Sequence, residues 1–153
     1  MNISVRQMTL DDYEPVHQVD VLTQRQYLGQ KFDELSPQEQ EKHLVSRKSE
    51  FKINVDTGYS FVAEDNGQII GFLLAYETLP FIGIIYIHYI GLNPKYQGKE
   101  IGLLLYKKLI EKAKHNYIKK IMSFINLDNP KSIRLHEKAG FELKDRKEAI
   151  LEL

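Results

Sequence analysis

A strand, a helix and a second strand follow one another between Ile84 and Ile125, and this unit constrains the fold more than any other feature. Residues 84–92 are mostly isoleucine, tyrosine and leucine, which favours a buried strand. Residues 101–115 carry apolar side chains at helical spacing, and residues 118–125 are again typical of a strand. Such a crossover makes the two strands locally parallel, with a right-handed connection. The sequence therefore predicts an α/β fold with a parallel pair in its sheet.

The rest of the chain adds hairpin strands and further helices to this unit. Asn66-Gly67 is a strong hairpin signal between two apolar runs. Ser36-Pro37 starts a helix, because it supplies a capping serine and a proline at the first helical position. We expect a single sheet in one domain of residues 1–153, without linkers or repeats. The expected order is a strand at 3–5, a helix from Thr9 to about Tyr27, a loop at 29–34, a helix from Ser36 to about Phe51, strands at 59–64 and 68–78, a turn at Leu79-Pro80, the crossover unit, a helix from Asn129 to Gly140, and a closing hairpin of 141–143 with 149–153.

The composition excludes several classes of protein. The chain has 21 basic and 21 acidic residues, whereas a general nucleic-acid binder usually carries a basic excess. The absence of cysteine excludes a disulfide scaffold, a cysteine nucleophile and a zinc–cysteine site, and the five histidines show no metal-ligand spacing. We expect a cytoplasmic protein, because residues 2–10 do not resemble a signal peptide. Glu77 and Pro80 interrupt the apolar stretch 69–92, which favours two strands over a membrane span.

Charge is unevenly distributed along the chain. Residues 95–138 contain eleven basic and four acidic residues, a net charge of +7. Residues 1–94 contain seven basic and thirteen acidic residues, a net charge of −6. This division favours an anionic ligand on the later half and a cationic ligand on the earlier half. For the lysines of the helix after Gly102, a solvated helix face is the preferred interpretation.

The loop from Pro94 to Gly102 joins the first strand of the crossover to its helix. Successive backbone N–H groups ahead of a helix N-terminus suit a phosphate, although an ordinary tight connection has the same pattern. The loop is not a P-loop, because no Gly-Lys-Ser/Thr follows, and its glycines are too far apart for a dinucleotide-binding fingerprint. Gly91, inside the preceding strand, indicates either a bulge or a packing constraint against a large neighbour.

Two motifs resemble those of the GCN5-related N-acetyltransferase (GNAT) family. The central family motif reads Gln/Arg-x-x-Gly-x-Gly/Ala after a strand that often ends in proline, and here Gln97-Gly98-Lys99-Glu100-Ile101-Gly102 follows Pro94. The later motif reads Asn-x-x-Ala-x-x-Leu-Tyr-x-Lys-x-Gly-Phe, and here Asn129 to Phe141 read Asn-Pro-Lys-Ser-Ile-Arg-Leu-His-Glu-Lys-Ala-Gly-Phe. The order of elements matches as well, so the resemblance covers nearly the whole chain.

The resemblance implies a fold, a cosubstrate and a reaction. The family fold is one mixed, mostly antiparallel sheet with a central, splayed parallel pair, flanked by about four helices. The implied reaction moves the acetyl group of acetyl-CoA to a primary amine by direct attack in a ternary complex. The alternatives are a protein N-terminal or lysine acetyltransferase and a non-catalytic CoA-binding module. The acceptor is a small molecule or a protein, neither nucleic acid nor membrane is expected as a partner, and the chain is expected to be a monomer or homodimer.

The resemblance also assigns the residues that contact acetyl-CoA. The pantetheine arm would pair with the strand end, where a backbone N–H would hold the developing oxyanion, and the pyrophosphate would bind the loop and the first turn of the helix. Asn129 suits either a cofactor contact or a helix N-cap, and both can hold. The expected cofactor-binding residues are Ile90, Gly91, Leu92, Gln97, Gly98, Lys99, Glu100, Ile101, Gly102, Leu103 and Asn129.

Two positions depart from the family pattern. Glu100 replaces the first motif glycine; it can still offer its N–H if φ stays negative, provided that its carboxylate points away from the pyrophosphate, and Lys99 can compensate its charge. His136 replaces the tyrosine that commonly protonates the departing thiolate. A protonated histidine can do the same, with more dependence on pH.

Three residues are candidates for the general base. His88 lies mid-strand, and by alternation it shares a side with Tyr86 and Ile90. A packed strand histidine is the simpler interpretation, but its ordinary pKa near neutrality suits a base near the reacting amine. Tyr86 and Glu77 are its rivals. The resemblance places the acceptor along the first two helices and the Asp33-Glu34 loop, and in the family an acidic residue on this strand often acts as the base. The expected catalytic residues are His136, from the resemblance, and His88 and Tyr86, from their place on the strand.

Overall fold

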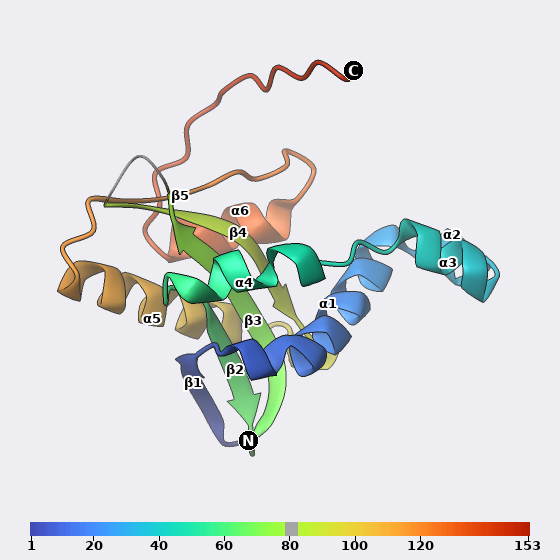
Figure 1. Cartoon of the computed structure of the whole chain (residues 1–153), viewed down its shortest axis with the longest axis horizontal. Coiled ribbons are helices and arrows are strands. Elements are labelled where there is room, and N and C mark those ends of the chain that lie inside the picture. The colour runs from blue at the N-terminus through green and yellow to red at the C-terminus, as the bar shows by residue number, and fades with distance from the viewer. Residues whose placement is uncertain (79–82) are drawn as a thin grey trace.

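The computed structural model describes residues 1–78 and 83–153, whose strands form one five-stranded sheet (Figure 1). The strands lie in sequence order in the sheet, and every neighbouring pair is antiparallel except β4 and β5, which are parallel. This confirms the mixed α/β fold and the parallel crossover. The strands are β1 (Ile3–Gln7), β2 (Phe61–Asp65), β3 (Gln68–Glu77), β4 (Ile84–Leu92) and β5 (Lys120–Ser123).

Helices cover both faces of the sheet (Figure 1). On one face lie α1 (Tyr13–Leu28) and α4 (Lys48–Asp56); on the other lies α5 (Ile101–His115), against which α6 (Pro130–Lys138) packs. The short helices α2 (Gln30–Asp33) and α3 (Pro37–His43) project from the end of α1 (Figure 1). Single 3₁₀ turns occupy Leu10–Asp12 and Pro94–Tyr96.

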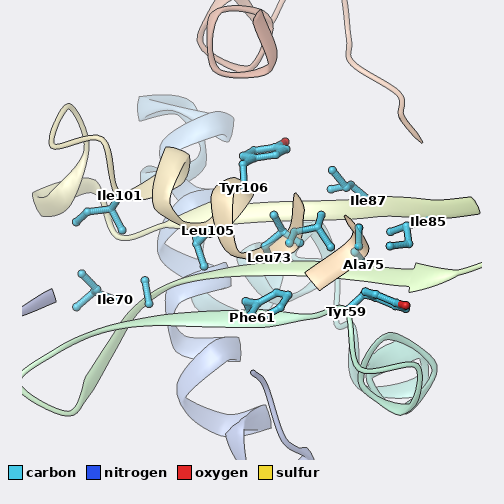
Figure 2. Packing of buried hydrophobic residues seen from close by; sticks show 13 residues of the cluster. Tyr59, Phe61, Ile70, Leu73, Ala75, Ile85, Ile87, Ile101, Leu105 and Tyr106 are labelled. Atoms are coloured by element: carbon cyan, nitrogen blue, oxygen red, sulfur yellow. The ribbon is translucent and has the colours of Figure 1, made fainter. Parts of the chain in front are cut away.

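Two buried clusters, one on each face, follow the alternation of side chains along the strands. The larger lies between the sheet and α5, where Phe61, Leu73 and Ile87 meet Leu105 and Tyr106 (Figure 2). The other lies under α1 and α4 and consists of Met8, Val16, Val19, Phe51, Val62, Ile69, Phe72 and Leu74.

The prediction of one helix from Ser36 to about Phe51 is wrong, because this segment forms two helices. Helix α3 ends at His43, and Leu44 is extended with φ −82° and ψ 129°. The side-chain amide of Gln24 on α1 accepts from Val45 N–H at 2.8 Å and donates to Val45 O at 3.0 Å. These bonds satisfy the backbone of the break, so α4 starts afresh at Lys48.

The expected closing hairpin is also wrong: residues 141–153 contain no strand. The five charged residues 144–148 separate its two apolar runs and include neither glycine nor proline. Ile150 and Leu151 are 73% and 83% exposed. The parallel pair therefore lies at the edge of the described sheet, and the strand expected at 118–125 shortens to Lys120–Ser123. The turn expected at Leu79-Pro80 lies outside the described residues.

Candidate functional site

The parallel strands separate halfway along β4. Their pairing runs from Ile84 opposite Lys120 to Ile87 opposite Ser123, where β5 ends. Strand β4 continues to Leu92, so among the described residues its last part has no strand partner on that side. Unpaired strand edges offer N–H and C=O groups to an extended ligand. The open edge includes Ile90, Gly91 and Leu92, where the pantetheine arm was expected.

The loop that follows β4 presents a run of unused backbone donors. Within the described residues, no backbone N–H from Gly98 to Leu103 donates a hydrogen bond. Gly98 has φ +78° and Glu100 has φ +59°, backbone conformations that occur where successive amides form an anion-binding nest, and the 15-residue helix α5 begins directly after them. Unpaired amides at a helix N-terminus bind anions. The chain therefore offers a cradle that fits a pyrophosphate.

Glu100 does not have the negative φ that was expected of a non-glycine residue at this position. Its φ is positive, so a glutamate holds the left-handed conformation that glycine adopts more readily. Its carboxylate is 69% exposed and its Oε1 lies 3.7 Å from Lys138 Nζ on α6. Lys99 Nζ lies 5.0 Å over the Tyr96 ring, and compensation of the Glu100 charge by Lys99 stays a prediction.

The glycines on either side of the loop permit close packing. A Cβ on Gly91 would lie 2.5 Å from Phe72 Cε1, so this position is a packing constraint rather than a bulge. A Cβ on Gly102 would lie 3.1 Å from Leu135 Cδ2, so the glycine lets α5 and α6 approach.

Gln97 and Asn129, two of the expected cofactor contacts, both make hydrogen bonds within the protein. The Gln97 amide exchanges hydrogen bonds with Gln26 of α1 at 2.7 and 3.2 Å and donates to Leu92 O at 3.4 Å. Asn129 Oδ1 accepts from Ser132 N–H at 3.1 Å, so Asn129 caps α6. The loop is thereby linked to α1 and to the end of β4.

His136 is packed inside the molecule. It is 2% exposed, its Nδ1 lies 2.8 Å from Ser132 O, and its Nε2 lies 3.0 Å from the Tyr106 hydroxyl. Nδ1–H can donate to the carbonyl while Nε2 accepts from the hydroxyl, which describes a neutral ring. Burial lowers the pKa of His136 and raises that of Tyr106. This geometry favours packing over proton donation. As expected, Gly140 ends α6, with φ +91°.

His88 lies on the α4 side of the sheet, at the point where β4 and β5 separate. It is the extra residue of a β-bulge, because Leu74 pairs with Tyr89 and Ala75 pairs with Ile87. The bulge shifts the alternation: His88 stacks with Tyr86, whereas Ile90 packs into the cluster beneath α5. The prediction that His88 and Ile90 share a side is therefore wrong.

Side chains of α4 hold the His88 ring. Its Nδ1 lies 3.4 Å from Asn54 Nδ2, and its Nε2 lies 3.5 Å from Glu50 Oε2. Burial lowers the pKa of His88 below its ordinary value, and the nearby carboxylate of Glu50 partly opposes this effect. The ring is therefore neutral at pH 7, the form that a base requires.

The two rivals of His88 have different surroundings. Burial raises the pKa of Tyr86, helped by Tyr76 and Glu148, so this hydroxyl keeps its proton. Glu77 Oε1 accepts from Gly83 N–H at 2.8 Å and so belongs to the connection between β3 and β4. Neither arrangement leaves a free base.

The sequence did not indicate that Arg47 and Asp20 lie near His88. The Arg47 guanidinium lies 4.0 Å from the centre of the Tyr89 ring, and Arg47 Nε donates to Asp20 Oδ2 at 2.9 Å. These residues come from the start of α4, from α1 and from β4. No spacing marks them, because only tertiary packing brings them together.

One surface hollow lies away from these residues. It has a volume of about 310 Å³ and lies between α1 and the β2–β3 hairpin, where Leu22, Glu64 and Gln68 line it. It contains none of the expected site residues. Within residues 1–78 and 83–153, no helix is both long and apolar enough to cross a membrane.

Comparison with known proteins gives one family. The model of the acetyltransferase (GNAT) family matches residues 17–141. An L-methionine sulfoximine/L-methionine sulfone acetyltransferase of Salmonella typhimurium is 33% identical over 82 residues, which are 52% of this chain and 48% of the relative. The chain spans 39–60% of the length of the curated relatives it matches.

Solved structures share the fold at low sequence identity. The PaiA N-acetyltransferase of Thermoplasma acidophilum, in complex with coenzyme A, superposes with a TM-score of 0.76 at 18% identity, covering 96% of this chain and 94% of that one. An aminoglycoside acetyltransferase from an uncultured soil sample superposes with a TM-score of 0.73 at 18% identity, over 100% of both chains.

Proposed function

Because the chain belongs to the acetyltransferase (GNAT) family, we propose that it transfers the acetyl group of acetyl-CoA to a primary amine, with residues 1–153 acting as one catalytic domain. The observation that carries the proposal is the run of unused amides from Gly98 to Leu103 beside the open edge of β4. Family membership alone does not require this chain to bind the cosubstrate, whereas this pair of features supplies both an anion site and a strand edge.

Two backbone segments bind different parts of acetyl-CoA. The amides from Gly98 to Leu103 hold the pyrophosphate, and the helix dipole of α5 favours its charge. The backbone of Ile90 to Leu92 pairs with the pantetheine arm, and one of its N–H groups holds the developing oxyanion. Bound acetyl-CoA supplies the activated acyl group.

His88 takes the proton of the amine. An acceptor amine has an ordinary pKa near ~10.4 if it resembles lysine, so it arrives as an ammonium. The two ring contacts of His88, to Asn54 at 3.4 Å and to Glu50 at 3.5 Å, are longer than those of His136, so the neutral His88 ring accepts that proton directly or through one water. Protonation of the departing thiolate by His136 stays a prediction, which the two hydrogen bonds of its ring disfavour.

The acceptor does not follow from the comparisons. The relatives act, by their names, on an amino-acid derivative and on aminoglycosides. A protein acceptor and a non-catalytic CoA-binding module are the alternatives. Cytoplasmic location and a monomeric or homodimeric state stay predictions.

Release of free coenzyme A tests the proposal. The chain contains no cysteine, so a thiol reagent added to the purified protein with acetyl-CoA reports only the coenzyme A formed. We expect thiol to appear in proportion to amine over a panel of small amines and peptides, with an acetylated product in the mass spectrum. Tight binding of acetyl-CoA without amine-dependent release over the panel would favour the non-catalytic module.

A further inference from the structure

On the α4 side of β4, Asp20 and Tyr89 hold the side chain of Arg47 in one orientation. The Arg47 guanidinium stacks on Tyr89, the residue after the bulge at His88, at 4.0 Å from the ring centre. Its Nε binds Asp20, which is 2% exposed. Ring face and carboxylate together fix the plane of the guanidinium and the direction of its remaining edge.

That remaining edge has no partner in the part of the chain that the structure describes. Neither Nη of Arg47 makes a hydrogen bond there, and neither is among its enclosed unpaired atoms. The side chain is 15% exposed, so the edge reaches solvent. A guanidinium edge of this kind binds a carboxylate through two parallel hydrogen bonds.

The ion pair of Arg47 and Asp20 is not explained by a contribution to the stability of the fold. Asp20 Oδ1 is enclosed and has no hydrogen-bond partner among the described residues. A buried ion pair with an unsatisfied oxygen is often less stabilising than apolar side chains of similar volume. The break between α3 and α4, fixed by Gln24 on Val45, holds the backbone that carries Arg47. These features position the arginine.

The opposite charge lies one helical turn away. Arg47 is the N-cap of α4 and Glu50 lies three residues later in the first turn, and both charges act on His88. Glu50 is 53% exposed and contacts His88 Nε2 at 3.5 Å. An ammonium near His88 would therefore meet a carboxylate, and an anion nearby would meet Arg47.

We propose that the acetyl acceptor is an amino acid, whose carboxylate binds the free edge of Arg47 while its amine lies at His88. This inference rests on the function proposed above, and makes Arg47 the residue that selects acceptors with a carboxylate. Aminoglycosides and protein lysine side chains lack a carboxylate beside their amine, so they would leave Arg47 unpaired.

Binding to the protein saturated with coenzyme A tests the inference without turnover. The common L-amino acids are titrated by calorimetry, and the tightest is compared with its carboxamide, which keeps the amine and loses the negative charge. We expect the carboxamide to bind about 10–100-fold more weakly, as for the loss of a paired charge. Arg47→Gln should weaken the amino acid to the affinity of its carboxamide.

Two variants keep the result interpretable. Lys48→Gln removes the adjacent positive charge, which lies 5.9 Å from the centre of the Tyr13 ring, and should leave the preference unchanged. Asp20→Asn with Arg47→Gln removes both buried charges, so a folded protein without the preference is expected even if Arg47→Gln alone unfolds.

The outcomes separate the two proposals. Equal affinity for acid and amide, or no amino acid bound at all, would overturn the role of Arg47. Amine-dependent release of coenzyme A from other acceptors would leave the proposed function standing in that case. A preference for the acid that persists in the double variant would also overturn the role of Arg47.

Discussion

Substitution of Gly91 by alanine tests whether this glycine serves packing or ligand binding. The added methyl group would lie 2.5 Å from Phe72 Cε1 and 2.6 Å from Cζ. Carbon atoms in contact prefer about 3.5–4.0 Å, so the ring must move by about 1 Å. Phe72 is 0% exposed and stacks on Tyr89 with 5.9 Å between ring centres, so the ring has no open space into which it can move.

The cost follows from overpacking. An extra methyl group in a filled core destabilises by about 1–3 kcal/mol, and each kcal/mol lowers Tm by about 2–4 °C in a domain of this size. Urea denaturation of Gly91→Ala, Phe72→Leu and the double variant measures it. Leucine at position 72 makes room, so the loss of unfolding free energy in the double variant should be smaller than the sum of the single losses by about 1 kcal/mol.

The same variants separate packing from ligand contact. The methyl group points at Phe72, not at the open edge of β4, so the folded Gly91→Ala protein should bind acetyl-CoA within about twofold of the parent. The packing explanation would be refuted if the two substitutions lowered the unfolding free energy additively, or if Gly91→Ala lost acetyl-CoA binding without losing stability.

Three further predictions concern the site. Lys99→Glu should weaken acetyl-CoA binding by about 5–10-fold in calorimetry through its charge beside the amides, whereas Lys107→Glu, further along α5, should not; equal effects would contradict the pyrophosphate placement. His136→Phe leaves the Tyr106 hydroxyl unpaired and should cost about 1–3 kcal/mol in urea denaturation with kcat retained, while a selective fall in kcat would restore its acid role. His88 has a lowered pKa, so kcat/KM should fall only below pH ~6.5 through this group, and His88→Ala should lose that acid limb; an unchanged pH profile would remove His88 from the mechanism.

Much of the fold could be predicted because its signals are local. The helical spacing after Ile101 and the Asn66-Gly67 turn each act over a few residues, and they lie in α5 and the β2–β3 hairpin as expected. The break after His43 could not be predicted, since it depends on Gln24, whose amide binds Val45 across 21 positions of the chain. The positive φ of Glu100 was not predicted either, although this residue replaces a glycine of the family motif, because glutamate itself prefers a negative φ.

The candidate site could be outlined from the sequence where the backbone forms it, but not where side chains from distant segments converge. Gly98 to Leu103 leave their backbone amides unused because they lie between a strand and the first turn of a helix, a position that the sequence indicates. The bulge at His88 was not predicted, because no residue type marks it and simple alternation continues through it. Arg47 and Asp20 are 27 residues apart, and only the packing of α1 against α4 and β4 brings them together.

Mapping of coenzyme A onto the backbone amides tests the central claim most directly. In nitrogen-15 spectra of the labelled protein, addition of coenzyme A should shift the amides from Gly98 to Leu103 most strongly, followed by those from Ile90 to Leu92. Gly98 and Gly102 are convenient reporters, because glycine amides resonate in a separate region. Shifts centred instead on Gly67 and Gln68, beside the hollow at the β2–β3 hairpin, would contradict the account.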